Sequence, residues 1–260
     1  MKIKANGISI NYQVDGPDGA PWLVLSNSLA TNLTMWDDQA RELGRAFRVL
    51  RYDQRGHGLT EAPAGRYPFD LLIADALALM DALAIRKAHF GGLSMGGATA
   101  LGLAQKHADR LDRVIVCDSP CQSTPTSSQQ WEERIVVAQE QGMEALVEPT
   151  IARWFPPDVI KANPPHVGKV RRMIRTTPVD GFIGCAAALA DHDYAAAVAR
   201  VTRPVLFLVG EKDAAAPPMR KLNEALPGSR FIELAGAGHI SNLDQPEGFT
   251  RAVKDFLAAK

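Results

Sequence analysis

The segment Gly92-Leu93-Ser94-Met95-Gly96 places a serine between two glycines, each two residues away from it. It follows the apolar residues 88–90 and precedes an alanine-rich stretch, so it is predicted to lead from a strand directly into a helix. At such a tight turn, the glycines leave room for the crowded backbone and the serine hydroxyl is pushed outward. A serine presented in this way can attack a carbonyl carbon. Small residues also occur at strand–helix junctions for packing alone, so this chemistry requires partners elsewhere in the chain.

A base and an acid are the first partners needed, because a serine hydroxyl is a weak nucleophile at neutral pH. His239 ends the segment Gly236-Ala237-Gly238-His239, after a predicted strand and before the last predicted helix. Asp213 follows the preceding predicted strand, in the segment 209–213. The chain order Ser94, Asp213, His239, with each residue at the carboxyl end of a strand, predicts a catalytic triad.

Asp118 is the alternative acid, because it follows the predicted strand that ends at Cys117. However, Asp118-Ser119-Pro120 also has the composition of an ordinary turn. Asp213 is therefore favoured as the acid.

An oxyanion hole requires two N–H groups aimed at the developing negative charge. The Met95 amide is one candidate, because it begins the helix after Ser94 and a helix N-terminus favours an anion. The second is expected in the loop after the strand ending at Leu25, which reads Ser26-Asn27-Ser28-Leu29-Ala30-Thr31.

The composition limits the classes of protein to be considered. The 260 residues suit one large α/β domain or two small ones, and 29 basic against 29 acidic residues argue against a nucleic-acid binder or an electrostatic membrane binder. The three cysteines lack metal-binding spacing and indicate reduced thiols in a cytoplasmic protein. Neither a signal peptide nor a membrane-spanning apolar run is expected. The sequence leaves the oligomeric state open.

The predicted elements alternate between strand and helix, which indicates a parallel sheet covered on both faces. After a hairpin at 2–14, strands are expected at 22–25, 47–52, 88–92, 114–117, 204–209 and 231–234, and helices at 34–45, 69–84, 95–106, 216–225 and 246–258. Residues 119–128 are predicted to form a loop, and residues 129–192 are helical without a strand. We therefore predict a core of residues 1–120 and 193–260, interrupted by a helical lid at 121–192.

The chain resembles the α/β-hydrolases over essentially its whole length. The likeness is carried by residues 27–36, Asp53-x-Arg55-Gly56-x-Gly58, 92–97, 210–213 and Gly238-His239. That family usually has His-Gly where this chain has Asn27-Ser28, but the spacing to Trp36 keeps the alignment and implies that Leu29 is the second oxyanion donor. The resemblance also implies an eight-stranded, mostly parallel sheet and a reaction without a metal or an organic cofactor.

A narrower resemblance is to the 3-oxoadipate enol-lactonases of aromatic catabolism. It is carried by Ser26-Asn27-Ser28-Leu29, residues 51–58 and 92–97, and by Trp154-Phe155 and Gly181-Phe182-x-x-Cys185-Ala186-Ala187 within the predicted lid. This likeness implies hydrolysis of a small anionic lactone, 3-oxoadipate enol-lactone, to 3-oxoadipate. The lid segments matter most, because in one fold the core is shared while the lid selects the substrate.

A substrate carboxylate would need a cation in a mostly apolar pocket. At most one of the lid arginines is expected to point inward, and Arg134 is preferred because it lies near Trp131. Trp131, Trp154 and Phe155 either line the pocket or pack within the lid. The arginines considered are Arg134, Arg153, Arg171, Arg172 and Arg175.

Other functions share the same serine, acid and base. A carboxylesterase, a carbon–carbon bond hydrolase and a perhydrolase are alternatives within the resembling family, whereas a haloalkane dehalogenase would need Asp in place of Ser94. A ligand receptor that kept the fold is an alternative from a different class.

Overall fold

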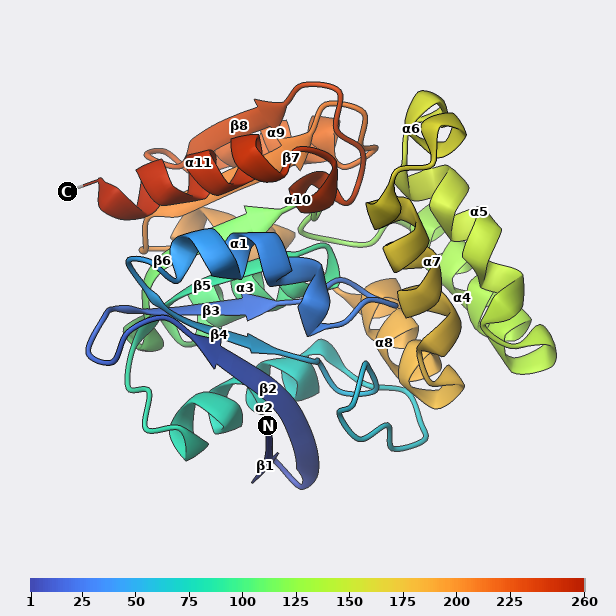
Figure 1. Cartoon of the computed structure of the whole chain (residues 1–260), viewed down its shortest axis with the longest axis horizontal. Coiled ribbons are helices and arrows are strands. Elements are labelled where there is room, and N and C mark those ends of the chain that lie inside the picture. The colour runs from blue at the N-terminus through green and yellow to red at the C-terminus, as the bar shows by residue number, and fades with distance from the viewer. Residues whose placement is uncertain (260) are drawn as a thin grey trace.

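The apolar runs of the sequence form one sheet of eight strands in the computed structural model, which describes residues 1–259 (Figure 1). The strands are β1 (Lys2–Ala5), β2 (Ile8–Asp15), β3 (Trp22–Ser26), β4 (Arg48–Tyr52), β5 (Ala88–Leu93), β6 (Leu111–Cys117), β7 (Val205–Gly210) and β8 (Arg230–Leu234). Their order is β1-β2-β4-β3-β5-β6-β7-β8. The pairs that β2 forms with β1 and β4 are antiparallel and the other five pairs are parallel, so the predicted mostly parallel sheet is confirmed.

Helices cover both faces of this sheet, because its strands are apolar on both sides. On one face, α1 (Asp37–Leu43) packs against α11 (Pro246–Ala258). On the other, α2 (Phe69–Ala82) packs against α3 (Met95–Lys106), while α9 (Ala216–Ala225) packs on β7 and β8. Within residues 1–259, none of the helices combines the length and the apolar character needed to cross a membrane.

A group of helices between β6 and β7 gathers at the end of the sheet toward which the parallel strands point (Figure 1). Within this group, α4 packs on α8 and α5 packs on α7. The group comprises α4 (Pro125–Gln141), α5 (Glu144–Trp154), α6 (Pro157–Ala162), α7 (Pro165–Thr176) and α8 (Val179–Asp191). We refer to it below as the helical cap.

The first cap helix begins earlier than the sequence predicts. Residues 119–128 were expected to form a loop, but α4 begins at Pro125. The Thr124 hydroxyl accepts a hydrogen bond from the Ser127 amide, and Pro125 occupies the first helical position, where its missing N–H is not needed. The Ser, Thr and Pro residues that resemble a loop therefore form the beginning of the helix.

The turn after β4 joins the cap to the sheet through a close backbone contact. A Cβ atom on Gly181 in α8 would lie only 1.9 Å from the Gly56 carbonyl oxygen. Beside this contact, the buried Cys185 thiol donates to the Arg55 carbonyl at 3.4 Å, and the Tyr67 amide donates to the Gly184 carbonyl at 3.1 Å. The Gly181–Cys185 segment thus attaches the cap to the core. Cys185 packs in this contact and does not line the pocket that contains Ser94.

The same turn is tied to α2 by a buried ion pair. The Arg55 guanidinium contacts the Asp75 carboxylate through two hydrogen bonds of 2.6 and 2.7 Å, and the side chains are only 6% and 3% exposed. Asn6 donates a third hydrogen bond to Asp75 at 2.7 Å. Removing one partner would leave a buried charge without compensation.

We therefore expect Asp75→Ala to lower the free energy of unfolding by about 3–5 kcal/mol, measured by urea denaturation. The control is Asp70→Ala on the same helix, because the ion pair of Asp70 with Lys106 is exposed and should contribute about 1 kcal/mol or less. Equal losses in the two variants would contradict a special role for the buried pair.

Candidate active site

Ser94 occupies a strained turn between β5 and α3. Its backbone lies at φ 55° and ψ −113°, and its amide donates to the Cys117 carbonyl at 2.8 Å. A Cβ atom on Gly92 would lie 2.1 Å from the Gly96 carbonyl oxygen, and one on Gly96 would lie 2.2 Å from the Ser26 carbonyl oxygen. The two glycines are therefore required by close backbone contacts, which hold the half-buried Ser94 side chain at the pocket.

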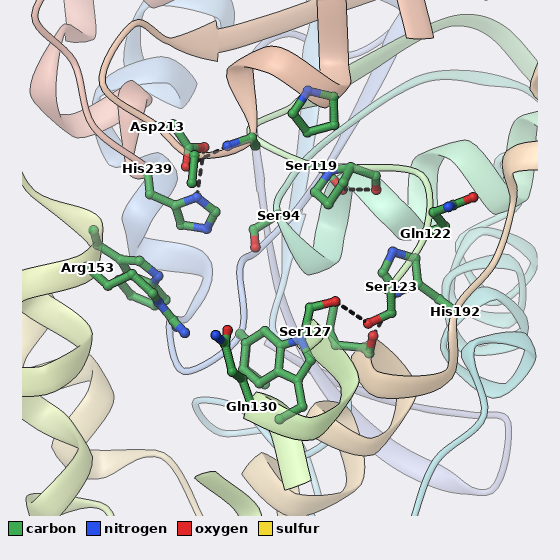
Figure 2. A pocket seen from close by; sticks show the side chains of 18 of the residues that line it. Ser94, Ser119, Gln122, Ser123, Ser127, Gln130, Arg153, His192, Asp213 and His239 are labelled. Atoms are coloured by element: carbon green, nitrogen blue, oxygen red, sulfur yellow. Dashed lines mark hydrogen bonds and ion pairs between the residues drawn. The ribbon is translucent and has the colours of Figure 1, made fainter. Parts of the chain in front are cut away.

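Asp213 and His239 lie beside Ser94 on the same side of the pocket (Figure 2). His239 Nδ1 is 2.9 Å from Asp213 Oδ2, and Asp213 Oδ1 accepts a hydrogen bond from the Ala215 amide at 3.2 Å. Because an ionised carboxylate only accepts hydrogen bonds, Nδ1 carries the proton, and in the neutral ring Nε2 is left as the acceptor. Burial raises the pKa of Asp213, but the charge and hydrogen bond of His239 outweigh it, so the pKa is lowered and the group stays ionised.

The end of α5 supports the His239 ring and backbone. The Trp154 ring stacks on the imidazole with 5.6 Å between ring centres and 29° between planes. The Trp154 carbonyl accepts a hydrogen bond from the His239 amide at 2.7 Å. The position of His239 therefore depends on the cap as well as on the sheet.

Asp118, the alternative acid, lies behind this pair and does not hydrogen-bond to His239 in the described chain. Its Oδ1 accepts from the Gly210 amide at 2.8 Å, and its Oδ2 accepts from the Ser241 hydroxyl. Burial, followed by the negative charge of Asp213, raises the pKa of Asp118 well above its usual range. This geometry favours Asp213 as the partner of His239.

The Leu29 amide in the loop after β3 differs from the other amides of residues 28–31. The amides of Ser28, Ala30 and Thr31 donate to Met35 Sδ, His57 Nε2 and the Ser28 carbonyl respectively. Among residues 28–31 of the described structure, only the Leu29 amide has no acceptor. Leu29 lines the same pocket as Ser94, and Met95 opens α3, so both amides are candidates for the oxyanion hole.

Asn27 stabilises this loop, at a position where the α/β-hydrolases that the chain resembles usually have histidine. Its side-chain amide donates to the carbonyls of Ser28 and Thr31 at 2.8 and 3.1 Å. Its Oδ1 accepts from the Gln54 amide at 2.9 Å. The departure from the family pattern thus changes the support of the loop and leaves the Leu29 amide free.

The pocket above Ser94 has a volume of about 240 Å³ and two different walls. One wall is polar but uncharged, and it lies on the far side of Ser94 from His239 (Figure 2). Sequence reasoning missed this wall, because its Ser-rich segment resembled a loop. It comprises Ser119, Gln122, Ser123 and Ser127, together with His192, whose Nδ1 donates to the Leu189 carbonyl. Gln130 also lines the pocket, but it lies below Ser94 in Figure 2, toward Arg153.

The other wall carries Trp131, Trp154, Arg134 and Arg153. The guanidinium carbons of Arg134 and Arg153 lie 4.5 and 5.3 Å from the centre of the Trp131 ring. Neither arginine forms an ion pair within the described chain. The prediction of at most one inward arginine is therefore wrong, because two neighbouring cap helices, α4 and α5, each direct an arginine toward one tryptophan.

Electrostatics distinguishes these two arginines from the others in the cap. Burial, followed by the positive charge of Arg134, lowers the pKa of Arg153 to about 9, so Arg153 is still a cation at neutral pH. Burial also lowers the pKa of Arg134. In contrast, Arg171 and Arg175 form exposed ion pairs with Glu148 and Glu144.

Two further sequence candidates lie outside the pocket. Arg172 is exposed on α7, and Phe155 is buried against the His166 ring with 5.7 Å between ring centres. Neither lines the pocket. Within residues 1–259, no group of three or more His, Cys, Asp or Glu side chains is placed to hold a metal ion.

Known proteins share the sequence pattern and the fold of this chain. Residues 21–246 match the family model of the alpha/beta hydrolase fold. A 3-oxoadipate enol-lactonase of Acinetobacter baylyi is 35% identical over 97% of this chain and 94% of its own. The crystal structure of an enol-lactonase from Burkholderia xenovorans has a TM-score of 0.95 and 40% identity over the full length of both chains. A proposed carbamate hydrolase of Pseudomonas syringae is 30% identical over 93% of this chain and 95% of its own.

The contacts at the serine turn can be tested with Gly96→Ala. The added Cβ would meet the Ser26 backbone, so we expect less than about 1% of wild-type hydrolysis or loss of the folded protein. The control is Gly168→Ala in α7, where the nearest atom is 3.9 Å away, and stability should rise by roughly 0.5–1 kcal/mol. Circular dichroism and ester hydrolysis measure both effects, and a fully active Gly96→Ala enzyme would contradict the close contact.

Proposed function

The chain belongs to the alpha/beta hydrolase fold family and is a hydrolase, and we propose that it opens a small enol-lactone carrying a free carboxylate. The proposed substrate is 3-oxoadipate enol-lactone and the product is 3-oxoadipate. Ser94 is the proposed nucleophile, His239 the base and Asp213 the group that orients it. Relatives of this chain are named enol-lactonases, and the residues that line its own pocket support the same activity.

The arginine pair at Trp131 is the observation that carries the proposal. Within residues 1–259, these two partly buried cations form no ion pair with a carboxylate; they repel one another, and a bound anion would relieve that repulsion. A guanidinium can also hold a carboxylate through two parallel hydrogen bonds. The pocket therefore suits a small anionic substrate better than a neutral one.

The position of Arg153 also fits the layout of an enol-lactone. In 3-oxoadipate enol-lactone, the distant carboxyl is esterified to the enol oxygen, and the free carboxylate lies on the enol half of the molecule. That half is the leaving group, which must face His239 to receive a proton. Arg153 precedes Trp154, which stacks on His239, so the cation lies on the side where a leaving-group carboxylate would be placed.

In the proposed acylation step, Ser94 Oγ attacks the lactone carbonyl and passes its proton to His239 Nε2. Asp213 stabilises the resulting imidazolium through its hydrogen bond to Nδ1. The amides of Leu29 and Met95 stabilise the tetrahedral oxyanion. The bond from the carbonyl carbon to the enol oxygen then breaks, and His239 returns its proton to that oxygen.

Hydrolysis of the acyl-enzyme completes the proposed cycle. His239 deprotonates a water molecule, which attacks the ester carbonyl and displaces Ser94. The product enol converts to the more stable ketone by moving its hydroxyl proton to carbon, which draws the reaction forward. Because an enol is more acidic than an ordinary alcohol, its oxygen also leaves readily.

Other reactions known for this fold would make no use of the two arginines in this pocket. A neutral ester or a neutral carbamate would bring no anion to Arg134 and Arg153, although Ser94 could attack either. A general carboxylesterase, a carbon–carbon bond hydrolase or a perhydrolase would be supported instead if the enzyme showed no preference for an anionic lactone.

The nucleophile assignment is tested by Ser94→Ala. Without the hydroxyl, no acyl-enzyme can form, so kcat for any ester substrate should fall by roughly four to six orders of magnitude. The thermal midpoint should change little because the side chain is small and half-buried. Steady-state hydrolysis near the wild-type rate would rule out Ser94 as the nucleophile.

The anion site is tested with two lactones that share a ring, one with the carboxymethyl group and one with a methyl group in its place. Arg153→Met should lower kcat/KM for the anionic lactone by roughly ten- to several-hundred-fold and for the neutral lactone less than about three-fold. Arg171→Met, at an exposed ion pair outside the pocket, is the matched control. Equal losses on both lactones would exclude Arg153 from carboxylate binding.

A further inference from the structure

The loop that carries the Leu29 amide contains a strained residue directly after it. Ala30 has φ 55°, in the left-handed region that an alanine rarely adopts, and it is only 2% exposed. The direction of the Leu29 N–H therefore depends on what holds the peptide groups on either side. On the preceding side, the Ser28 carbonyl accepts from the Thr31 hydroxyl and the Asn27 side chain, both at 2.8 Å.

On the following side, His57 holds the loop. Its Nε2 is 2.9 Å from the Ala30 nitrogen, and its Nδ1 is 3.0 Å from the Arg55 carbonyl oxygen. A carbonyl oxygen can only accept, and the Ala30 amide can only donate. These two contacts require the tautomer with the proton on Nδ1 and a lone pair on Nε2.

The surroundings of His57 maintain this form. The side chain is fully buried, and burial lowers its pKa to about 4, although the Arg55 carbonyl opposes the change. The imidazole is therefore neutral at physiological pH and can accept from Ala30. A protonated ring would have an N–H at Nε2 facing the Ala30 N–H.

The turn that carries His57 is itself rigid. The Gly56 amide donates to the Glu61 carbonyl at 3.0 Å, and the His57 amide donates to the Gln54 carbonyl at 2.9 Å. Gly56 also makes the close contact with Gly181 of the cap. His57 thus connects a well-held turn to a strained loop that would otherwise leave the Ala30 N–H buried without a partner.

We infer that His57 is a positioning residue of the oxyanion hole: its Nε2 lone pair holds the Ala30 amide and so aims the neighbouring Leu29 N–H at the oxyanion formed on Ser94. This inference rests on the proposed acyl transfer by Ser94 but not on the identity of the lactone. His57 does not line the pocket, so it acts through the loop and not on the substrate.

The test compares His57→Gln with His57→Leu, because the glutamine carbonyl can place an acceptor near the position of Nε2 and leucine cannot. The substrate is p-nitrophenyl acetate, a neutral ester that does not depend on the anion site. We expect His57→Leu to lower kcat about 10- to 100-fold with KM changed less than about three-fold. His57→Gln should recover most of kcat.

A trifluoromethyl ketone, which forms a tetrahedral adduct with serine, separates positioning from a purely structural role. Its affinity should fall in His57→Leu in proportion to kcat/KM and return in His57→Gln. A kcat in His57→Leu within three-fold of wild type would overturn the inference. So would equal losses in the two variants with unchanged affinity for the ketone.

The tautomer provides a measurement on the wild-type protein in case His57→Leu does not fold. Nitrogen NMR shifts of labelled His57 should show a proton on Nδ1 and none on Nε2 at neutral pH. A proton on Nε2 would overturn the inference. Ser94→Ala is assayed in parallel: activity retained there refutes the proposed nucleophile, whereas a normal His57→Leu enzyme with an inactive Ser94→Ala refutes only the role of His57.

Discussion

The close packing of three backbone segments around Ser94 is the constraint on which the rest of the site depends. The end of β5, the start of α3 and the end of β3 approach so closely that Gly92 and Gly96 have no room for a Cβ atom. This contact gives Ser94 its unusual backbone conformation and brings the loop after β3 beside the start of α3. The serine hydroxyl and both candidate oxyanion amides are therefore placed by one packing arrangement. A change in any of the three segments would move all of them.

The cap contributes to the position of His239 as well as to the shape of the pocket. The same residue of α5, Trp154, stacks on the His239 ring and accepts a hydrogen bond from its amide. Arg153, one position earlier, contributes a charge to the pocket. Elsewhere in the cap, α8 packs on Gly56 of the core through Gly181. The end of α5 thus contributes both to the orientation of His239 and to the charge of the pocket.

Charge in the site is distributed unevenly. The acidic groups, Asp213 and Asp118, lie behind His239, where hydrogen bonds from backbone and side-chain donors surround them. The positive groups, Arg134 and Arg153, face the cavity without a carboxylate partner in the described chain. A buried charge is costly when it is unpaired. The side of the cavity that holds the two arginines is therefore positively charged, although the whole chain has a formal net charge of zero.

The local parts of this protein were predictable from the sequence. Periodicity and chain order indicated the sheet, the serine turn and the order of Ser94, Asp213 and His239, because strand–helix junctions and their glycines depend on neighbouring residues. Sequence reasoning also limited the candidate pocket cations to a few cap arginines, but it underestimated how many of them face the pocket. The beginning of α4 was misplaced because capping residues resemble loop residues.

Only the tertiary structure decided which distant groups meet. The stacking of Trp154 on His239, the approach of Arg134 and Arg153 to one tryptophan, and the hydrogen bond from Ala30 to His57 all join separate elements. Their formation depends on how the cap helices pack on the carboxyl end of the sheet. That packing is set by close contacts such as Gly56 with Gly181, between residues far apart in the chain. The sequence by itself thus determined the fold and the serine turn at Ser94, whereas packing decided which charged and supporting groups surround that turn.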